Sequence, residues 1–496
     1  MTTTCIDGAF IVVDANPRVG GVLVDGRRIV GLAWAKEDRA ALRAGAAQVV
    51  DAAGHWLMPG LIDGHAHAYG TLLRGTENSL PLELWALYTT LYGRAFDGAS
   101  LRAAILLGAA ERIRGGITGT LDHSPMVHLA PDALAAHEAS GLRVAYAPFL
   151  HDLSDYDLLD VKLPPALQPL VGGPPPLDAD AYAANFAALV QAAHGGSGRV
   201  SVQLGPNAPQ RCSPAGWMLW RTLRERHDIA VHTHLMETRA QASLNARWPG
   251  GLVAEMQRQG LLEGRLTCAH GVWLTDADLA TLARHDVTIS HNPASNLMLG
   301  SGMMRWCACA TWGVRLALGN DSANTGGRHD HFSQMRLALM LPRHAGGDFS
   351  TKPRPREVFL AATEGGAAAL GLQGRLGRIS EGQLADLVLL RATDAGSLAA
   401  EPTLDVLVQH AGAEHVRSVM IDGVWVMHDG RILAFDEAAV LRDAQARAVA
   451  LRDRVASSLP VLAAAMPDMT AQFARQGQRW TGSDRERKIA SADRMH

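Results

Sequence analysis

Residues 58–70, "MPGLIDGHAHAYG", combine a short apolar run with two histidines that stand two positions apart. Side chains at positions i and i+2 of a strand point to the same face of a sheet. If Leu61 to His67 form a strand, His65 and His67 face the same way and can hold one ion. A His-x-His pair is common in proteins without a metal, so the other ligands must come from elsewhere in the chain.

Seven further apolar runs follow the first, and helical stretches such as "DADAYAANFAALVQAAHGG" separate most of them. The eight runs cover residues 61–68, 117–123, 143–150, 199–206, 229–235, 266–272, 287–293 and 314–321. Strands that alternate with amphipathic helices predict parallel βα units, and eight units predict an α/β fold of the (β/α)8 barrel type. The alternative is an open doubly wound sheet, but no G-x-G-x-x-G motif follows the first run.

The two ends of the chain have a different pattern, with short β-rich runs and Asp-Gly turns at 25–26, 422–423 and 429–430. We predict a small β-sandwich domain built from both termini, residues 1–57 and 376–435, around a barrel of residues 58–375. Residues 436–496 are predicted to be a helical extension that ends in the charged tail "TGSDRERKIASADRMH".

Residues 151–178, rich in proline and glycine, follow the third strand as a long loop. Such a loop is either a lid or substrate wall, or an insertion that is partly disordered.

Composition excludes several classes of partner. The chain has 496 residues, a formal net charge of −3 and no basic tract, so nucleic acid and anionic membranes are poor partners. The start lacks the features of a signal peptide, and no run of about 18 apolar residues occurs. Five scattered cysteines argue against a disulfide framework. We expect a cytoplasmic protein.

The ends of the predicted strands carry histidines and carboxylates. Catalytic groups of a (β/α)8 barrel lie at the C-terminal ends of its strands, so side chains distant in sequence meet at one rim. Here these side chains are His65, His67, His234, Glu237, His270 and Asp321. Coincidence is a poor explanation for so many suitable residues at four strand ends.

This set suits one divalent ion, because zinc-type ions bind imidazole nitrogen and carboxylate oxygen and leave a position open in catalytic sites. We expect three histidines and one aspartate as ligands: His65, His67, His234 and Asp321. The ion would lower the pKa of a water molecule, and Asp321 would accept its proton. Glu237 would carry protons to a leaving group or ring nitrogen, and His270 would hold the water or polarise the attacked atom.

Five stretches carry a resemblance to a known family: "PGLIDGHAHAYGTLLRG", "HTHLMET", "AHGVWLTDADLATLARHDVTISHNPASNLMLGSG", "LALGNDSAN" and "GRISEGQLADLVLL". They resemble the amidohydrolase superfamily, in the branch of cytosine-type and adenosyl-type deaminases and s-triazine hydrolases. The resemblance spans about residues 5–435. It implies a distorted barrel, a flanking β-sandwich, one zinc (sometimes iron), self-association as a homo-oligomer, the same four ligands, and Glu237 and His270 as catalytic residues.

Lysines bear on the number of metal ions. Some hydrolases of this architecture hold two metals, bridged by a carboxylated lysine on strand four. The chain has only four lysines, none at a strand end: Lys36, Lys162, Lys352 and Lys488. Strand four reads "RVSVQLGPNAP". A mononuclear site follows, with zinc as the leading candidate and iron as the alternative, since both accept these ligands.

The predicted pocket departs from the deaminases that it resembles. Asn207 stands where a substrate-contacting histidine often lies, Asn320 replaces the usual threonine before Asp321, and "ANTGG" replaces a common S-N-N. An asparagine cannot carry charge, which weakens a prediction of a nucleoside substrate. The candidate substrate contacts are Arg74, Trp85, His123, Asn207, Trp273 and Asn296. Trp85 and Trp273 would stack on a flat ring, or else they are packing residues. His232 shares the face of His234, and we favour a supporting or core role for it.

The leading hypothesis is a metal-dependent hydrolase of carbon–nitrogen bonds that deaminates a planar aminated heterocycle of pyrimidine, purine or s-triazine type. The alternative keeps the site and changes the bond: hydrolysis of an amide, urea or carbamate, or displacement of a ring substituent such as chloride. A distant alternative is a non-catalytic scaffold, but scaffolds commonly lose ligands and this chain keeps the whole set. The predicted partner is therefore a small molecule.

Overall fold

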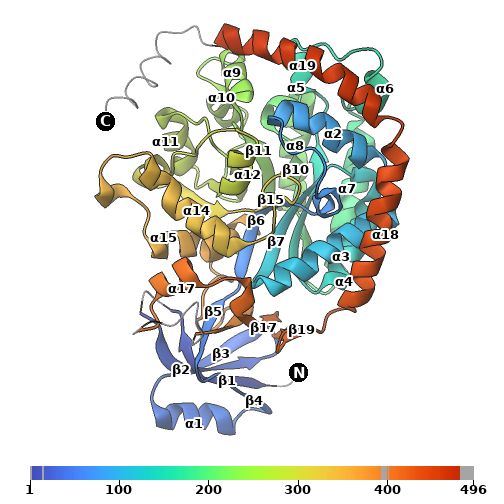
Figure 1. Cartoon of the computed structure of the whole chain (residues 1–496). Helices are drawn as coiled ribbons and strands as arrows, with labels where there is room; N and C mark the ends of the chain where they lie inside the picture. Colours follow the sequence, from blue (N-terminus) through green and yellow to red (C-terminus); the bar gives the residue numbers. More distant parts are fainter. Residues whose placement is uncertain (1–2, 14–15, 393–398, 400, 481–496) are drawn as a thin grey trace.

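The computed structural model describes the chain except residues 1–2, 14–15, 393–398, 400 and 481–496. It has two parts, a barrel surrounded by helices and a β-rich domain at one end of the barrel (Figure 1). The charged tail predicted for the C-terminus lies outside the described residues. Among the described residues, no helix combines the length and apolar character needed to cross a membrane.

All eight predicted runs form strands, and neighbouring strands of the barrel are parallel. The strands are β6 (Leu61–His67), β7 (Ile117–Ser124), β8 (Arg143–Leu150), β9 (Val200–Val202) with β10 (Gly205–Pro206), β11 (Val231–Leu235), β12 (Leu266–His270), β13 (Thr288–His291), and β14 (Arg315–Leu318) with β15 (Asp321–Ser322). A parallel bridge between Leu204 and Val231 joins β10 to β11, and β15 pairs with β6. The ring of strands is thus closed, and the predicted (β/α)8 fold is confirmed.

Helices cover the outside of the barrel. The longer ones are α2 (Leu82–Arg94), α3 (Gly98–Arg114), α4 (Ala130–Ser140), α7 (Ala179–His194), α8 (Pro214–His227), α10 (Leu252–Arg258), α11 (Asp276–Arg284), α13 (Trp306–Trp312) and α14 (His331–His344). Shorter ones are α5 (Asp155–Leu158), α6 (Gln168–Val171), α9 (Arg239–Ser243), α12 (Pro293–Met298), α15 (Pro355–Leu360), α16 (Gly366–Ala369) and α17 (Leu404–His410). Local sequence sets several starts: the Asp97 carboxylate caps α3, and Thr275 with Asp278 forms a capping box on α11.

Strands from both ends of the chain share one sheet below the barrel (Figure 1). They are β1 (Thr4–Ile11), β2 (Arg18–Asp25), β3 (Arg28–Ala33), β4 (Gln48–Asp51), β5 (His55–Pro59), β16 (Leu387–Arg391), β17 (Val416–Ile421), β18 (Val424–His428) and β19 (Arg431–Ile432); the same domain carries α1 (Lys36–Ala44). The link between the two ends is the antiparallel pair β5 and β16. The β-rich domain from both termini is confirmed, and its nine strands form one continuous sheet.

A buried ion-pair cluster joins the β-rich domain to the N-terminal ends of the barrel strands. Arg143, the first residue of β8, donates to Asp386 at 2.9 and 2.8 Å and to Asp422 at 2.9 Å. All three side chains are at most 7% exposed. Because the β-rich domain occupies this end, the opposite, C-terminal end of the barrel is left for the site.

The last described helices, α18 (Glu437–Val455) and α19 (Leu459–Trp480), run along α3 and across α2 (Figure 1). The segment 151–178 packs beneath α19. The Gln472 side chain exchanges two hydrogen bonds with the backbone of Lys162, at 2.8 and 2.9 Å, and the rings of Tyr156 and Phe473 are 6.2 Å apart. This segment therefore forms an ordered part of the barrel wall.

Candidate metal and catalytic site

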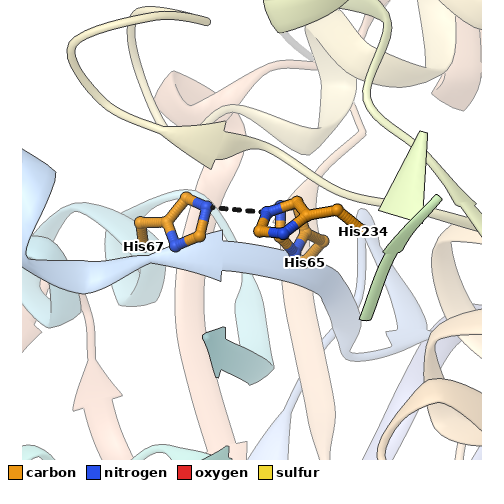
Figure 2. Close-up of side chains that lie close together, drawn as sticks. All are labelled: His65, His67 and His234. Carbon is orange, nitrogen blue, oxygen red and sulfur yellow. Dashed lines mark hydrogen bonds between the residues drawn. The ribbon is translucent and has the colours of Figure 1, made fainter. Parts of the chain in front are cut away.

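Three histidines from two strands meet at the C-terminal end of the barrel. Figure 2 shows His65 and His67 on one strand and His234 opposite them, with the rings turned toward one another. The Nε2 atoms of His67 and His234 are 3.3 Å apart. The Asp321 carboxylate closes the group, because its Oδ1 atom lies 3.5 Å from His65 Nε2 and 3.4 Å from His67 Nε2. The four predicted ligands thus converge on one point.

The Nδ1 atom of each of these three imidazoles is held by another group. The contacts are His65 Nδ1 with His232 Nε2 at 2.8 Å, His67 Nδ1 with the His123 carbonyl at 2.5 Å, and His234 Nδ1 with the Asn207 carbonyl at 2.6 Å. An imidazole whose Nδ1–H donates to an acceptor presents the lone pair of Nε2 and has a fixed ring orientation, as metal-binding histidines do. His232, for which the sequence favours a supporting role, supplies one of these acceptors.

The donor atoms fit a divalent ion. Burial lowers the pKa of His65 to about 4 and holds the pKa of His234 well below its usual value, so both rings are neutral at pH 7. Neutral imidazole is the form that binds zinc-type ions. Among the described residues, the buried Nε2 atom of His65 has no hydrogen-bond partner. Because an unpartnered buried nitrogen costs free energy, an ion at this point accounts for the arrangement.

His65 belongs to two other triads of close donor atoms, one with His123 and His232 and one with His270 and Asp321. The first is less suited to an ion, because His123 Nε2 donates to the Gly205 carbonyl at 3.2 Å and His232 Nε2 faces His65 Nδ1. The second contains the predicted ligand Asp321, whose negative charge favours a cation. His65, His67, His234 and Asp321 are therefore the best-suited set to hold an ion.

The Asp321 carboxylate is held by its neighbours. Ser295 Oγ donates to Oδ2 at 2.6 Å, and the Ser322 amide donates to Oδ1 at 2.8 Å. Burial opposes its ionisation, but the close contact with His65 and the other nearby imidazoles lower the pKa of Asp321, so it is a carboxylate. His270 Nε2 lies 3.8 Å from Oδ2. A fixed carboxylate beside an imidazole is suited to accept a proton.

Glu237 follows β11 and lies beside His270. Its side chain is buried, with Oε1 3.7 Å from His270 Nδ1. Burial, together with the negative charge of Asp321, raises the pKa of Glu237 well above its usual value. The raised pKa favours the protonated carboxyl, which is the form that a general acid requires.

The backbone is strained at the C-terminal rim of the barrel, next to the ends of β11, β12 and β14. Met236, His270 and Asp321 have φ values of +48, +74 and +62°, in the left-handed region that residues other than glycine rarely adopt. Among the described residues, the other non-glycine positions with positive φ are aspartates outside this rim, a residue type that tolerates the conformation better. Strain of this kind persists where the surrounding structure fixes it, and it commonly marks functional sites.

Three of the predicted substrate contacts, His123, Asn296 and Asn207, lie at or beside the cluster, and the fourth, Trp85, is buried in α2. His123 lies with its ring centroid 4.8 Å from that of His234, and Asn296 Oδ1 accepts from His270 Nδ1 at 2.9 Å. The Asn207 side chain faces His151 rather than open space. The Trp85 indole is 7% exposed, and its buried Nε1–H has no hydrogen-bond partner among the described residues. A buried donor without a partner is available to a ligand, so Trp85 stays a candidate substrate contact.

Arg74 and Trp273 are placed differently. The Arg74 guanidinium forms an ion pair with Glu111 of α3 and is 38% exposed. Trp273 is 39% exposed, and its Nε1–H donates to the Ser301 carbonyl at 2.8 Å. Both side chains therefore have partners of their own, and the described contacts do not join either one to the histidine cluster.

A polar network beside Asn207 was not predicted from the sequence. Asn207 Nδ2 lies 2.7 Å from His151 Nδ1, and Arg211 donates to Asn207 Oδ1 at 3.0 Å and to Asp155 Oδ2 at 2.5 Å. Ser295 was missed as well. The motif "HNPASN" was the available signal for Ser295, whereas neither His151 nor Asp155 belongs to a recognisable motif.

The protein is a metal-dependent hydrolase by fold and site, and comparison with known proteins identifies its family. The family model described as "Amidohydrolase family" matches residues 56–426. The chain therefore belongs to the amidohydrolase family, and the resemblance noted in the sequence is confirmed. This membership makes it an enzyme that hydrolyses carbon–nitrogen bonds with a divalent metal ion, as expected.

Similar proteins are deaminases. The chain is 32% identical over 417 residues to 5-methylthioadenosine/S-adenosylhomocysteine deaminase of Desulforudis audaxviator, covering 82% of this chain and 90% of that protein. It is 31% identical over 451 residues to 5'-deoxyadenosine deaminase of Methanothermobacter thermautotrophicus, covering 90% and 98%. The crystal structure of an adenosine deaminase from Xanthomonas campestris with bound zinc superposes with a TM-score of 0.80 at 27% identity, covering 91% and 98%. The expected deamination of a heterocycle is confirmed.

Proposed function

We propose that this enzyme is a mononuclear zinc deaminase that removes the 6-amino group of adenine in nucleosides with a modified 5' position. Two observations support the substrate class: relatives at 31 and 32% identity act on 5'-deoxyadenosine and 5-methylthioadenosine, and they match most of the chain. Zinc is supported by the structure at 27% identity that contains it and by the imidazole-rich ligand set.

The observation that carries the proposal is the buried Glu237 carboxyl, which lies 3.7 Å from His270 Nδ1 beside the cluster. Deamination of a purine requires a proton on the ring nitrogen next to the attacked carbon, so that electron density moves away from that carbon. Burial and the negative charge of Asp321 raise the pKa of Glu237, which favours the form that can donate this proton. Simple displacement of chloride from a ring would release an anion that needs no proton.

The other residues position the nucleophile and move its proton. When bound, the divalent ion supplies a water molecule of lowered pKa. Asp321 Oδ2 would accept a proton from that water, and His270 Nε2, 3.8 Å away, would orient it. The Asn296 side chain fixes the His270 ring through Nδ1. The amine would take the proton held by Asp321 and leave as ammonia. The hydroxyl added to the ring would return its proton to Glu237, which gives the 6-oxo product.

We expect the substrate to be an uncharged, flat ring. The free Trp85 Nε1–H is a candidate donor to a ring nitrogen or to a sugar oxygen. Asn207, in place of a histidine, adds no titratable group to this wall, and its amide is held by His151 and Arg211. We therefore expect less discrimination at this position than in relatives with a histidine.

A substrate panel tests the proposal. The purified enzyme is incubated with 5'-deoxyadenosine, 5'-methylthioadenosine, adenosine, guanine, cytosine, melamine, a chlorinated s-triazine and a simple amide, and ammonia and products are measured. We expect ammonia and the 6-oxo product from the 5'-modified adenosines at the highest kcat/KM. Release of chloride or of a carboxylic acid as the main reaction would contradict it.

The Glu237→Gln variant tests the role of the carboxyl. Glutamine preserves size and hydrogen bonding but cannot transfer a proton, so kcat should fall by about 10²–10⁴-fold. Metal content, measured by mass spectrometry, should stay near one equivalent, because Glu237 is not a proposed ligand. A variant with a near-normal rate would remove Glu237 from the mechanism, and two equivalents of metal would refute the mononuclear site.

A further inference from the structure

A second polar site lies at the opposite end of the barrel, outside the catalytic machinery. A cavity of about 210 Å³ opens between the β-rich domain and the N-terminal ends of β8 and β9. Five of its lining side chains are arginines: Arg27, Arg28, Arg143, Arg199 and Arg375. No aspartate or glutamate is among the residues that line it within the described part of the chain.

Two of the five arginines are engaged in the joint between the domains. Arg143 is saturated by Asp386 and Asp422, as described above. Arg27 Nε lies 2.7 Å from Asp422 Oδ2, and this side chain is 44% exposed. These two guanidinium groups need no further anion.

The other three have weaker partners or none. Arg28 donates to the Gly382 carbonyl, which is uncharged, at 2.5 Å. The described contacts include no hydrogen bond or ion pair for the Arg375 side chain. Arg199 has a long ion pair, with Nη2 3.9 Å from Glu138 Oε2, and within the described structure its buried Nε atom has no hydrogen-bond partner. A joint between domains explains Arg143, but it does not explain three further arginines at one cavity whose described lining contains no carboxylate.

The cations come from separate segments. Arg28 begins β3 in the β-rich domain, Arg199 precedes β9 in the barrel, and Arg375 lies in the connection that follows α16. Like charges gathered at one point repel, and low-dielectric walls strengthen the field inside a cavity. An anion that enters would relieve this repulsion and would bridge the two domains.

The remaining wall is apolar. Val144, Leu370 and Leu384 line the cavity and are at most 6% exposed. A site that places guanidinium groups beside aliphatic side chains matches a ligand with an anionic group and an apolar or flat remainder. Guanidinium pairs best with phosphate and carboxylate oxygens, and several arginines around one group favour the higher charge of phosphate.

We propose that this cavity binds the phosphate group of a small organic phosphate ester, with Arg28, Arg199 and Arg375 around the phosphate and the organic part on the apolar wall. The site is distinct from the metal site and independent of the substrate proposed above. Because the ligand contacts both domains, binding stabilises the folded protein by mass action.

The test uses the full-length metal-loaded enzyme and two probes, phenyl phosphate and inorganic phosphate, at constant ionic strength set with sodium chloride. Thermal melting and calorimetric titration report binding, and phenol controls for the ring alone. We expect saturable binding of phenyl phosphate and a higher melting temperature. Equal binding of inorganic phosphate would identify free phosphate as sufficient and would still support phosphate recognition; preference for phenyl phosphate would assign a role to the apolar wall.

Variants locate the site. The Arg199→Gln/Arg375→Gln double variant should raise the dissociation constant at least tenfold and leave kcat unchanged. The exposed Arg102→Gln and Arg284→Gln substitutions, elsewhere on the barrel, form the matched control and should bind as the native protein does. If the double variant misfolds, the single Arg375→Gln variant, which alters an exposed side chain, replaces it and should still weaken binding. Unchanged binding in these variants, or no saturable binding by the native protein, would overturn the proposal.

Discussion

The two ends of the barrel both concentrate ionisable side chains, but they pair them differently. At the C-terminal end, His65, His67 and His234 are each fixed through Nδ1, and their Nε2 atoms face one another. At the N-terminal end, Arg143 meets two carboxylates that satisfy it. A group that must bind a ligand keeps one polar atom free, at a cost in stability, whereas a group that joins two domains has all its hydrogen bonds made.

Substitutions in the histidine cluster should have the largest effect of all, and the effect should be on metal binding and activity rather than on stability. We expect the His67→Ala variant to lose the metal ion and all measurable deamination, because the remaining ligands no longer surround the ion. The barrel should stay folded, with a melting temperature close to that of the metal-free native enzyme, because the lost contacts serve the ion and not the core. Metal analysis, an ammonia assay and thermal melting are the measurements. An active variant with a full equivalent of metal would show that the ion lies elsewhere.

At the N-terminal end of the barrel, we expect a substitution to lower stability and leave turnover unchanged. Replacing Arg143 by methionine leaves the Asp386 and Asp422 carboxylates buried without their main partner, which should lower the free energy of unfolding by about 3–5 kcal/mol. Turnover per folded molecule should not change, since the joint lies at the far end of the strands. Arg27→Gln is the matched control: it removes an exposed partner of Asp422 and should cost at most about 1 kcal/mol. Denaturant unfolding of both variants measures the difference, and an equal loss would show that burial does not matter here.

The same contrast explains what the sequence could predict. The barrel and its four proposed ligands follow from periodicity and from the rule that strand ends meet, so a histidine or aspartate at a strand end is informative by position alone. The partners of these groups follow no such rule. Ser295 reaches Asp321 from a short helix, and the Asn207 carbonyl reaches His234 from another strand. Such contacts depend on tertiary geometry, which short motifs do not encode.

Arg74 illustrates why a candidate substrate contact is hard to choose from sequence alone. It lies next to the first strand motif, and proximity in sequence suggested a substrate contact, but in the folded protein Glu111 of α3 is its partner. Trp85, on the following helix, has the same sequence argument and does keep a free buried donor. Sequence alone could not separate the two, because the difference lies in whether another element supplies a partner.

Two substitutions of His232 test whether the hydrogen bond at His65 Nδ1 increases the affinity for the metal ion. In His232→Leu, the Nδ1–H of His65 loses its acceptor, and metal affinity should fall by about 10–100-fold. His232→Gln restores an acceptor through its side-chain carbonyl and should recover part of this loss. Competition of each variant with a calibrated chelator gives the affinities. Equal affinities for the leucine variant and the native enzyme would mean that the strand alone orients the ring.

The smallest effect is expected on the flank of the barrel, at Asp97, which caps α3 and accepts from Arg454 of α18 at 2.6 Å. Partial burial alone would raise its pKa, but the hydrogen bonds from Ser100 and Arg454 lower the pKa of Asp97 from 3.8 to about 2. A carboxylate with a lowered pKa stabilises the fold at pH values above its unfolded pKa, and this contribution disappears as the pH falls through the folded value.

Asp97→Asn keeps the cap, because asparagine accepts the same bond from the helix, and removes only the charge. At pH 7 the variant should therefore be less stable by about 0.2–1 kcal/mol, the usual range for an exposed ion pair. The melting temperatures of variant and native enzyme should converge as the pH falls from about 5 toward 2, where the native carboxylate also becomes neutral. A difference that stays constant with pH would mean that Asp97 acts through hydrogen bonding alone. In that case the exposed Asp97–Arg454 ion pair would contribute nothing to the free energy of unfolding, in contrast to the buried joint at Arg143. Any electrostatic stabilisation between α3 and α18 would then come from the other ion pair between them, Arg114 with Glu437.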